Sequence, residues 1–398
     1  MITIGNYVPY HVHSDISNAT TNIDSVTKFK EYIGVAKELG MKAFAFSEHG
    51  NIFEWYFKKL AIEEAGMKYI HACEIYVTMH EDKKVHDNYH CVVIAKNRAG
   101  FEELNRLVST AYNRSDNHFF YAPRVYMSEL ENTSENIIIT TACIGGALAS
   151  DVEEDRQRFL RFVMSNKNRC FLEIQHHQDI KQCEYNKELV ALSKKYGIRL
   201  IAGTDTHALT EKHLEGRKIL QEAKDIKFSN ETQWDMVFKS YDELCEAYRK
   251  QGALEEDVWL SAIENTNVMA DMVEPIEIDT SNKYPNIYDN PVEMFRKIVY
   301  EAAENHPYAI KRHGREKLFA RIEEELAVYE KTGAVPYMLL KNYLTQWERE
   351  HGIFIGCGRG SVSGSMIAYL LHITEMDSMK FDLNFFRFLN PNRVSLAD

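Results

Sequence analysis

The sequence lacks the features of a membrane-spanning or disulfide-bonded protein. No apolar run among the 398 residues is long enough to cross a bilayer, and Met1–Tyr10 has neither the basic start nor the long apolar core of a signal peptide. The seven cysteines form no CxxC pair, which is typical of reduced thiols inside a cell. We therefore expect a cytoplasmic protein of two or three domains that has no membrane partner.

Basic residues are scarce in the first part of the chain. The net charge is −12, from 47 Lys and Arg against 59 Asp and Glu. Residues 281–398 hold 15 of each sign, so residues 1–280 hold 32 basic and 44 acidic residues and carry the whole net charge. An acidic first part attracts multivalent cations and argues against a basic nucleic-acid patch there, whereas the neutral second part does not repel phosphate.

Residues 1–210 alternate between short β-rich runs and amphipathic stretches. This alternation predicts a parallel sheet, and seven strands predict a distorted (β/α) barrel whose site lies on the loops after the strands. The expected strands are Tyr7–His13, Lys42–Ser47, Tyr69–Thr78, Tyr89–Ala95, Asn136–Thr141, Cys170–Gln175 and Arg199–Gly203. The expected helices are Val26–Leu39, Phe53–Ala65, Arg98–Tyr112, Glu154–Asn166 and Lys181–Tyr196.

The rest of the chain is expected to be mostly helical. Residues 211–278 contain one clear helix at Asp257–Met272, and a linker rich in Pro, Asn and Asp follows at Asp279–Pro291. Further helices are predicted at Val292–Asn305, Arg315–Thr332 and Pro336–Glu350. We thus divide the chain into a barrel with C-terminal helices (1–278), a linker (279–291) and a further domain (292–398).

Metal-binding residue types recur at the strand ends. If Tyr7–His13 is a strand, His11 and His13 point the same way and can bind one ion. Residues of the same kind follow at nearly every later strand, which gives nine candidate ligands: His11, His13, Asp24, His49, Glu74, His90, Cys143, Asp205 and His207. This set of N and O donors with one S fits up to three Zn²⁺, Mn²⁺ or Fe ions and fits Mg²⁺ or Ca²⁺ poorly. Phosphoester hydrolysis is the natural chemistry of such a cluster.

Several of these residues have simpler interpretations. A lone Cys143 is more often a buried thiol. Asp24 could cap the following helix, and Asp15 competes for its place as a ligand. Glu48 could be a surface carboxylate. His176 and His177 have no matching partner and are left out of the ligand set.

The series His11-x-His13, Glu48-His49-Gly50-Asn51, Glu74, His90, Cys143 and Asp205-x-His207 resembles the PHP (polymerase and histidinol phosphatase) family. The resemblance implies a (β/α)7 barrel with a trinuclear metal site, and it associates a filled ligand set with hydrolysis. It makes Asp205 and His207 the catalytic candidates. Tyr121-Ala122-Pro123-Arg124 also looks like an element of this family, in which Arg124 is expected to steady a phosphate.

A second motif lies at residues 352–365. An apolar strand, Ile353–Ile355, is expected to enter a Gly/Ser turn, and Val362–Leu371 to continue as a helix. Backbone N–H groups at the start of such a helix attract anions, and an arginine adds a bidentate phosphate contact. The turn lacks the lysine of a Walker A loop, and an ordinary tight turn between strand and helix is the alternative. The predicted phosphate-binding residues are Gly358, Arg359, Gly360 and Ser361.

This motif and the residues after it resemble the palm of C-family DNA polymerases, the bacterial DNA polymerase III alpha subunits and their phage relatives. The resemblance lies in Gly358–Ser365, Ile367–Thr374 and Phe388–Ser395, although Cys357 replaces the usual proline. It implies an incomplete α+β palm at 292–398, whose two metal-binding aspartates would follow Asp398. It also implies a dNTP bound with Mg²⁺ in a complete palm.

The resemblance further implies a set of partners. They are the 3′ end of DNA or a primer–template, the remainder of the polymerase from the same gene or a second chain, and other replisome components. The implied location is the cytoplasm of a bacterium or of a phage host.

Three functions are therefore compared. The favoured one is the N-terminal portion of a replicative DNA polymerase whose barrel is a metal-dependent 3′–5′ exonuclease. The alternatives are a free-standing phosphoesterase of the histidinol-phosphatase kind and a barrel whose metals only brace the polymerase. Metal content cannot separate the first function from the last, but turnover can.

Overall fold

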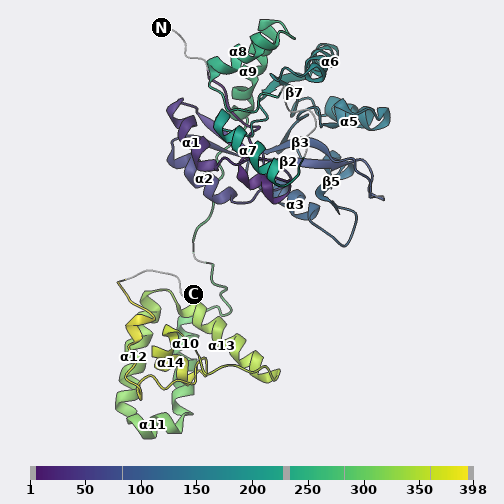
Figure 1. The fold of residues 1–398 in the computed structure, drawn as a ribbon. Helices are drawn as coiled ribbons and strands as arrows, with labels where there is room; N and C mark the ends of the chain where they lie inside the picture. Colours follow the sequence, from purple (N-terminus) through teal and green to yellow (C-terminus); the bar gives the residue numbers. More distant parts are fainter. Residues whose placement is uncertain (1–5, 83, 227–233, 282, 359, 393–398) are drawn as a thin grey trace. The chain divides into compact units, whose positions relative to one another are not determined.

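The computed structural model describes residues 6–82, 84–226, 234–281, 283–358 and 360–392. The chain divides into two compact units, Met1–Glu277 and Ile278–Asp398, which are described separately below (Figure 1). The first unit holds all the strands of the described residues, and the second is built of helices. Of the described helices, none combines the length and the apolar character needed to span a membrane.

The predicted strands of the first unit are formed with one exception. They are β1 (Ala43–Phe46), β2 (Lys68–Thr78), β3 (Tyr89–Ala95), β6 (Ile137–Thr140), β7 (Cys170–Gln175) and β8 (Arg199–Gly203). Two short strands that the sequence analysis missed, β4 (Phe119–Phe120) and β5 (Ala122–Tyr126), extend the sheet beside β2. The order is β4-β5-β2-β3-β6-β7-β8, and β1 also pairs with β2.

The exception is Tyr7–His13, which is not a regular strand although its backbone closes the sheet. Pro9 has no N–H to donate, which interrupts a regular ladder. Its carbonyl still accepts from Ala45 N (3.0 Å), and Val12 O accepts from Ser47 N (2.9 Å). On the other side, His13 N donates to Thr206 O (2.8 Å), and Thr206 N donates to His11 O (3.1 Å). The segment thus joins β1 to the end of β8 and completes the predicted barrel.

The sheet is not wholly parallel, which corrects the expectation. Strand β3 runs antiparallel to both β2 and β6. The connection from β2 to β3 contains no helix, so the chain turns back directly instead of crossing over. As a result β3 begins at the edge of the sheet where the parallel strands end.

Alternating residues of the strands pack on opposite faces of the sheet. Inward side chains such as Ile70, Val92 and Phe171 form one core inside the barrel, which Met269 and Val273 of the last helix region close at the bottom. Outward side chains pack under the surrounding helices in a second core. These helices are α1 (Phe29–Glu38), α2 (Trp55–Glu64), α3 (Arg98–Ala111), α4 (Met127–Glu131), α5 (Glu153–Ser165), α6 (Ile180–Tyr196), α7 (Glu211–Ala223), α8 (Tyr241–Gln251) and α9 (Glu256–Asp271).

The second unit has its own apolar core. Its helices are α10 (Pro291–Glu304), α11 (Pro307–His313), α12 (Arg315–Lys331), α13 (Val335–Glu350) and α14 (Met366–Leu370). The expected strand Ile353–Ile355 is wrong, because this segment has no neighbouring strand to bond with among the described residues, and Phe354 is 93% exposed. The expected helix Val362–Leu371 is shorter: a 3-10 turn, Ser361–Gly364, precedes α14.

Candidate metal centre

The His11–His13 pair lies at the mouth of the barrel, between the ends of β1 and β8. Both side chains are fully buried, and their ring centroids are 5.3 Å apart. The Nε2 atoms of both rings lie 3.4 Å from Asp205 Oδ1, and each also lies 3.4 Å from an oxygen of Glu74. His11, His13 and Asp205 therefore form a first metal-capable group.

A second group gathers around Glu74 of β2. Glu74 Oε2 lies 2.8 Å from His49 Nδ1, and Oε1 lies 3.0 Å from His90 Nδ1. His49 follows β1, and His90 reaches the same edge because β3 is antiparallel. Since the same carboxylate also faces His11 and His13, Glu74 touches four imidazoles and has the position of a ligand shared between ions.

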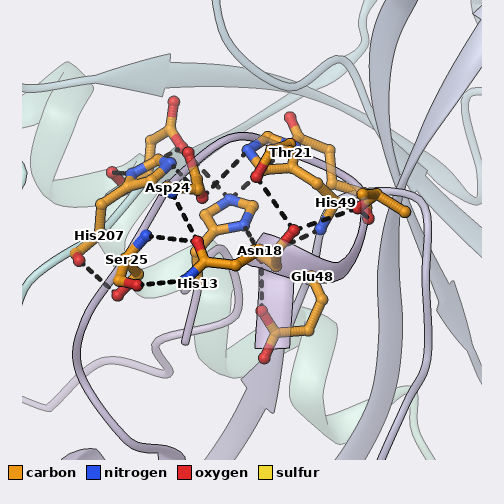
Figure 2. Close-up of polar contacts among 12 residues, drawn as sticks. His13, Asn18, Thr21, Asp24, Ser25, Glu48, His49 and His207 are labelled. Carbon is orange, nitrogen blue, oxygen red and sulfur yellow. Dashed lines mark hydrogen bonds and ion pairs between the residues drawn. The ribbon is translucent and has the colours of Figure 1, made fainter. Parts of the chain in front are cut away.

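A third group consists of His13, Asp24, His49 and His207. Asp24 Oδ2 lies 3.3 Å from His207 Nε2 and 3.5 Å from His49 Nε2. The ring of His13 stacks against those of His49 and His207, with centroids 4.2 and 4.4 Å apart (Figure 2). Because His13 and His49 each belong to two groups, the three groups form one continuous centre.

Asp24, and not Asp15, lies in one of these metal-capable groups. Asp15 pairs with Lys28 and stays outside the centre. Helix α1 begins after Lys28, so Asp24 does not cap it. Instead the Asp24 N–H donates to Asn18 Oδ1 at 2.6 Å (Figure 2). Arg217 Nε donates to the Asp24 carbonyl (2.5 Å), and the two bonds fix the loop.

Cys143 borders the second group. Its Sγ lies 3.6 Å from His90 Nδ1 and accepts the N–H of Gly145 at 3.4 Å. Burial raises the pKa of this thiol, and the nearby carboxylates of Asp205 and Glu74 raise it further. Eight of the nine predicted ligands thus belong to the three groups, and the ninth lies beside them.

The buried atoms of the centre fit a metal. Six of them have no hydrogen-bond partner: His11 Nε2, His13 Nε2, Asp24 Oδ2, His49 Nδ1 and both carboxylate oxygens of Glu74. Burying polar atoms without partners costs free energy, and divalent ions would supply the missing partners. Imidazole nitrogens with carboxylate oxygens suit Zn²⁺, Mn²⁺ or Fe²⁺.

Hydrogen bonds behind the rings leave the Nε2 atoms free to bind metal. His11 Nδ1 lies 2.6 Å from Glu173 Oε1, and His13 Nδ1 lies 3.1 Å from Ser17 Oγ. His207 Nδ1 lies 2.9 Å from the carbonyl of Asp205. These partners favour the tautomer protonated at Nδ1, the arrangement common among metal-binding histidines.

The electrostatics of the centre favour a cation. Burial lowers the pKa of His13 to about 4, and its His49 and His207 neighbours act in the same direction. Burial also acts to lower the pKa of His49, but the carboxylates of Asp24 and Glu74 outweigh it and raise that pKa to about 9. Against burial, the imidazoles hold the pKa of Glu74 well below its usual range. The carboxylates therefore draw positive charge into the centre, which a divalent ion provides while the rings stay neutral.

Glu48 is not the surface carboxylate that was considered. It is buried and accepts from Ser14 Oγ (2.5 Å), Ser17 Oγ (2.6 Å) and Lys58 Nζ (2.6 Å). Since Ser17 Oγ also contacts His13 Nδ1, Glu48 supports the centre through Ser17. This role of Glu48 was not predicted from the sequence, and neither was the contact of Glu173 with His11. The sequence signal for Glu173 was its place on β7, two residues after Phe171, which puts its carboxylate on the same inward face.

Two family models match the chain in succession: the PHP domain at residues 9–177 and the bacterial DNA polymerase III alpha NTPase domain at residues 293–398. The chain carries a PHP domain followed by a DNA polymerase III alpha segment. The DNA polymerase III subunit alpha of Borreliella burgdorferi is 30% identical over 414 residues, covering 98% of this chain and 34% of that protein. The same subunit of Aquifex aeolicus is 30% identical over 428 residues, covering 99% of this chain and 36% of that protein. The chain thus spans about a third of the length of these relatives, and the resemblance seen in its sequence is confirmed.

Within the PHP domain, Arg124 does not join the metal-capable groups. It is fully buried on β5, and its guanidinium donates to the carbonyls of Val85 (2.8 Å), His118 (3.2 Å) and Asn117. The predicted phosphate contact of Arg124 is therefore not supported. Burial and these bonds give it the role of holding the loops before β3 and β4.

His176 and His177 follow β7 and are also buried in the PHP domain. The Asp235 N–H donates to His177 Nδ1 (3.2 Å), and His176 Nε2 lies 3.8 Å from Asp235 Oδ2. Neither ring belongs to a metal-capable group of the described residues.

The glycine turn of the polymerase segment differs from its prediction. Arg359 lies outside the described residues. Gly358 has φ +101°, and a Cβ there would lie 2.4 Å from Thr374 Oγ1, so the turn needs glycine at this position. Gly360 and Ser361 lead into the 3-10 turn rather than directly into a helix.

The start of α14 is already occupied by a carboxylate. Glu325 of α12 accepts from Met366 N (2.7 Å), Ile367 N (3.1 Å) and Ser365 Oγ (2.7 Å). These two backbone N–H groups are therefore not available to a phosphate, because a buried side chain of the same unit already accepts from them. Only the turn itself stays available for an anion.

Proposed function

We propose that the chain is the N-terminal portion of a DNA polymerase III alpha-type replicative enzyme, and that its PHP domain is a metal-dependent 3′–5′ exonuclease. The relatives named DNA polymerase III subunit alpha, aligned over 98% and 99% of the chain, support the first part. Polymerase activity and a DNA substrate are part of the proposal, because the chain spans only about a third of those relatives.

One observation carries the exonuclease proposal. Three metal-capable groups share residues in a single buried cluster and leave six polar atoms without hydrogen-bond partners. When bound, clustered divalent ions polarise a phosphate and lower the pKa of water, so this donor set supports hydrolysis of a phosphodiester. We expect up to three Zn²⁺, Mn²⁺ or Fe ions, with all nine predicted ligands taking part.

The chain's own residues fix the ligands and leave one open side. Asp205 has φ +45°, an unusual conformation for a residue other than glycine, which holds its carboxylate toward His11 and His13. His207 faces Asp24 from the same loop. The side chain of His90 is 26% exposed, more than those of Glu74, His49 or Asp24. A phosphate would therefore approach past His90, with Asp205 and His207 beneath it as the proposed catalytic residues.

We further propose that the polymerase segment contacts a dNTP through Gly358, Arg359, Gly360 and Ser361, with Mg²⁺ in a complete palm. The neutral charge of residues 281–398 supports this, since it does not repel a triphosphate. The proposed partners are the 3′ end of DNA or a primer–template, the remainder of the polymerase and replisome components.

The test is nuclease activity of the purified 398-residue chain on a 5′-labelled single strand and on a primer with a mispaired 3′ end. We expect slow, Mn²⁺- or Zn²⁺-dependent shortening from the 3′ end. Binding should be weak, since the PHP part carries the whole −12 charge and releases few counterions from DNA. Asp205→Asn should abolish the activity, because it removes a negative ligand at nearly constant volume.

The alternatives predict different results. Equal rates for wild type and Asp205→Asn across several metals would assign the activity to a contaminant and leave the metals a bracing role. Hydrolysis of histidinol phosphate without any action on DNA would favour the free-standing phosphoesterase.

A further inference from the structure

Glu173 lies directly behind the metal centre without belonging to it. It sits on β7 with its side chain inside the barrel and fully buried. Its Oε2 accepts from Thr140 Oγ1 (2.6 Å) and Tyr10 Oη (2.9 Å). Its Oε1 accepts from Gln175 Nε2 (2.8 Å) and lies 2.6 Å from His11 Nδ1. The carboxylate is therefore held on both sides, with one oxygen aimed at a metal-binding ring.

This contact sets how His11 faces the centre. Glu173 Oε1 already accepts from the amide of Gln175, and it accepts from His11 as well, so the proton of the His11 ring has to be on Nδ1. The opposite nitrogen, Nε2, then presents its lone pair toward Glu74 Oε1 and Asp205 Oδ1, each 3.4 Å away. His11 Nε2 is one of the buried atoms without a hydrogen-bond partner.

Among the described residues, no lysine or arginine forms an ion pair with Glu173. Glu48, the corresponding carboxylate behind His13, pairs with Lys58 at 2.6 Å. Among the ion pairs of the described residues, Glu173 has only that with His11. A buried carboxylate without a lysine or arginine is costly, and positive charge beyond His11 would compensate it.

The neighbouring strand leaves room for this carboxylate. A Cβ at Gly203 of β8 would lie 2.0 Å from Glu173 Oε1 and 2.4 Å from its Cδ. Any larger residue at position 203 would have to displace Glu173 from His11. Glycine at the end of β8 and glutamate on β7 are thus sterically coupled.

We infer that Glu173 is a positioning residue of the metal centre, which fixes the tautomer and orientation of His11. This inference rests on the proposed metal centre. In the metal-loaded protein, Glu173 keeps a proton on His11 Nδ1 and makes Nε2 a stronger ligand. Gly203 serves the same function by leaving space for the Glu173 carboxylate.

The experiment measures Zn²⁺ affinity by competition with a chromophoric chelator, and histidine ring protons by nitrogen-15 NMR of the Zn²⁺-loaded chain. Glu173→Gln and Gly203→Ala should weaken the tightest measurable Zn²⁺ site by about 10- to 100-fold. Thr140→Val is the matched control, because Thr140 bonds only the oxygen that faces away from His11. It should change the affinity by less than about threefold.

The NMR measurement compares wild type with Glu173→Gln. Wild type should bind Zn²⁺ through His11 Nε2 with a hydrogen-bonded proton on Nδ1, and Glu173→Gln should weaken or lose that signal. Coordination through Nδ1 in wild type, or unchanged affinity in both Glu173→Gln and Gly203→Ala, would overturn the inference and leave the proposed function intact. Absence of Zn²⁺ binding in wild type would instead contradict the metal centre itself.

Discussion

Two buried glutamates, one in each unit, differ in how completely their carboxylate oxygens are hydrogen-bonded. Glu74 of the PHP domain faces four imidazoles, yet neither of its oxygens has a hydrogen-bond partner. Glu325 of the polymerase segment accepts from two backbone N–H groups, the Ser365 hydroxyl and Arg321 Nε (2.7 Å). Burial raises the pKa of Glu325, whereas the imidazoles keep the pKa of Glu74 low against burial.

This difference distinguishes a carboxylate placed to bind a ligand from one that only stabilises the fold. Both carboxylates are fully buried, so burial alone does not distinguish them. Glu325 completes the hydrogen bonds of α14 and needs nothing further, but Glu74 lacks partners that only an added group can supply.

Removal of metal should change the PHP domain most. We expect about two to three transition ions per chain by elemental analysis, and each tightly bound ion should stabilise this unit by about 4 kcal/mol at a thousandfold excess over its Kd. A chelator should therefore lower the melting temperature markedly. The double variant His11→Ala, His13→Ala should lower both the ion count and the melting temperature. Fewer than one ion per chain in protein purified without added metal would refute the prediction.

Loss of the Glu325 carboxylate should have the second-largest effect on stability, and the effect should be confined to the polymerase segment. Glu325→Ala leaves the N–H groups of Met366 and Ile367 without their partner and should cost about 3 kcal/mol of unfolding free energy. Hydrogen exchange at Met366–Leu370 measures this, and Glu324→Ala, at a more exposed neighbour, is the control.

Glu74→Gln should behave in the opposite way. In metal-free protein it should cost less stability than Glu325→Ala, about 1 kcal/mol, because its oxygens lie 2.8 and 3.0 Å from the rings of His49 and His90 without completing a hydrogen bond to them. It should nevertheless reduce the ion count. Equal losses of stability in the two glutamate variants would break the contrast.

Acid should lower the unfolding free energy of the metal-free PHP domain by less than Glu325→Ala lowers that of the polymerase segment. Burial, with help from the charge of Lys58 and against the hydrogen bond to Asn105, lowers the pKa of His71 to about 4. Its unfolded value is about 6.5, so the stability that the neutral ring contributes is present above pH 6.5 and is lost as the pH falls toward 4.

For His71 the loss between pH 7 and 5 should be about 2 kcal/mol. Urea unfolding of chelated protein between pH 7 and 5 measures it. His71→Gln should reduce the slope, while the buried rings of His176 and His177, with pKa values lowered by burial to about 3, should keep part of it. An unchanged slope in the variant would contradict the assignment to His71.

Nucleotide binding by the isolated polymerase segment should be the weakest effect. Because Glu325 already binds the start of α14, only the glycine turn is left to hold a triphosphate. We expect dNTP binding in the millimolar range, weakened by about tenfold in Arg359→Ala and unchanged in Arg349→Ala, whose side chain pairs with Glu375. Micromolar binding by wild type would mean that the turn does not depend on the rest of a palm.

The sequence was sufficient for the elements with strong local patterns. Strands β3, β7 and β8 have the predicted bounds, and α3, α5, α6 and α9 lie within one residue or so of their expected ends. Apolar residues that recur every two or 3.6 positions can be recognised in the sequence, because this spacing reflects which side of a strand or helix is buried. The nine candidate ligands could be found because their residue types recur at strand ends, where a barrel brings them together.

Weak local signals were missed or misread. Strand β4 has two residues, too few for a pattern, and the five-residue strand β5 contains Pro123, a residue that counts against a strand in the sequence. Ile353–Ile355 has the composition of a strand, but a strand also needs a neighbour to bond with, and the described residues supply none.

Which residues can bind metal, and which faces of the elements are apolar, could be predicted from the sequence, because both depend on side-chain type and spacing. Which carboxylates have all their hydrogen-bond partners, and which do not, depends on the folded chain. Glu173 meets His11 across 162 positions of sequence, and Glu325 meets Met366 across 41. Such partners are chosen by packing, since a carboxylate is satisfied by whichever donors the folded chain places within about 3 Å of it.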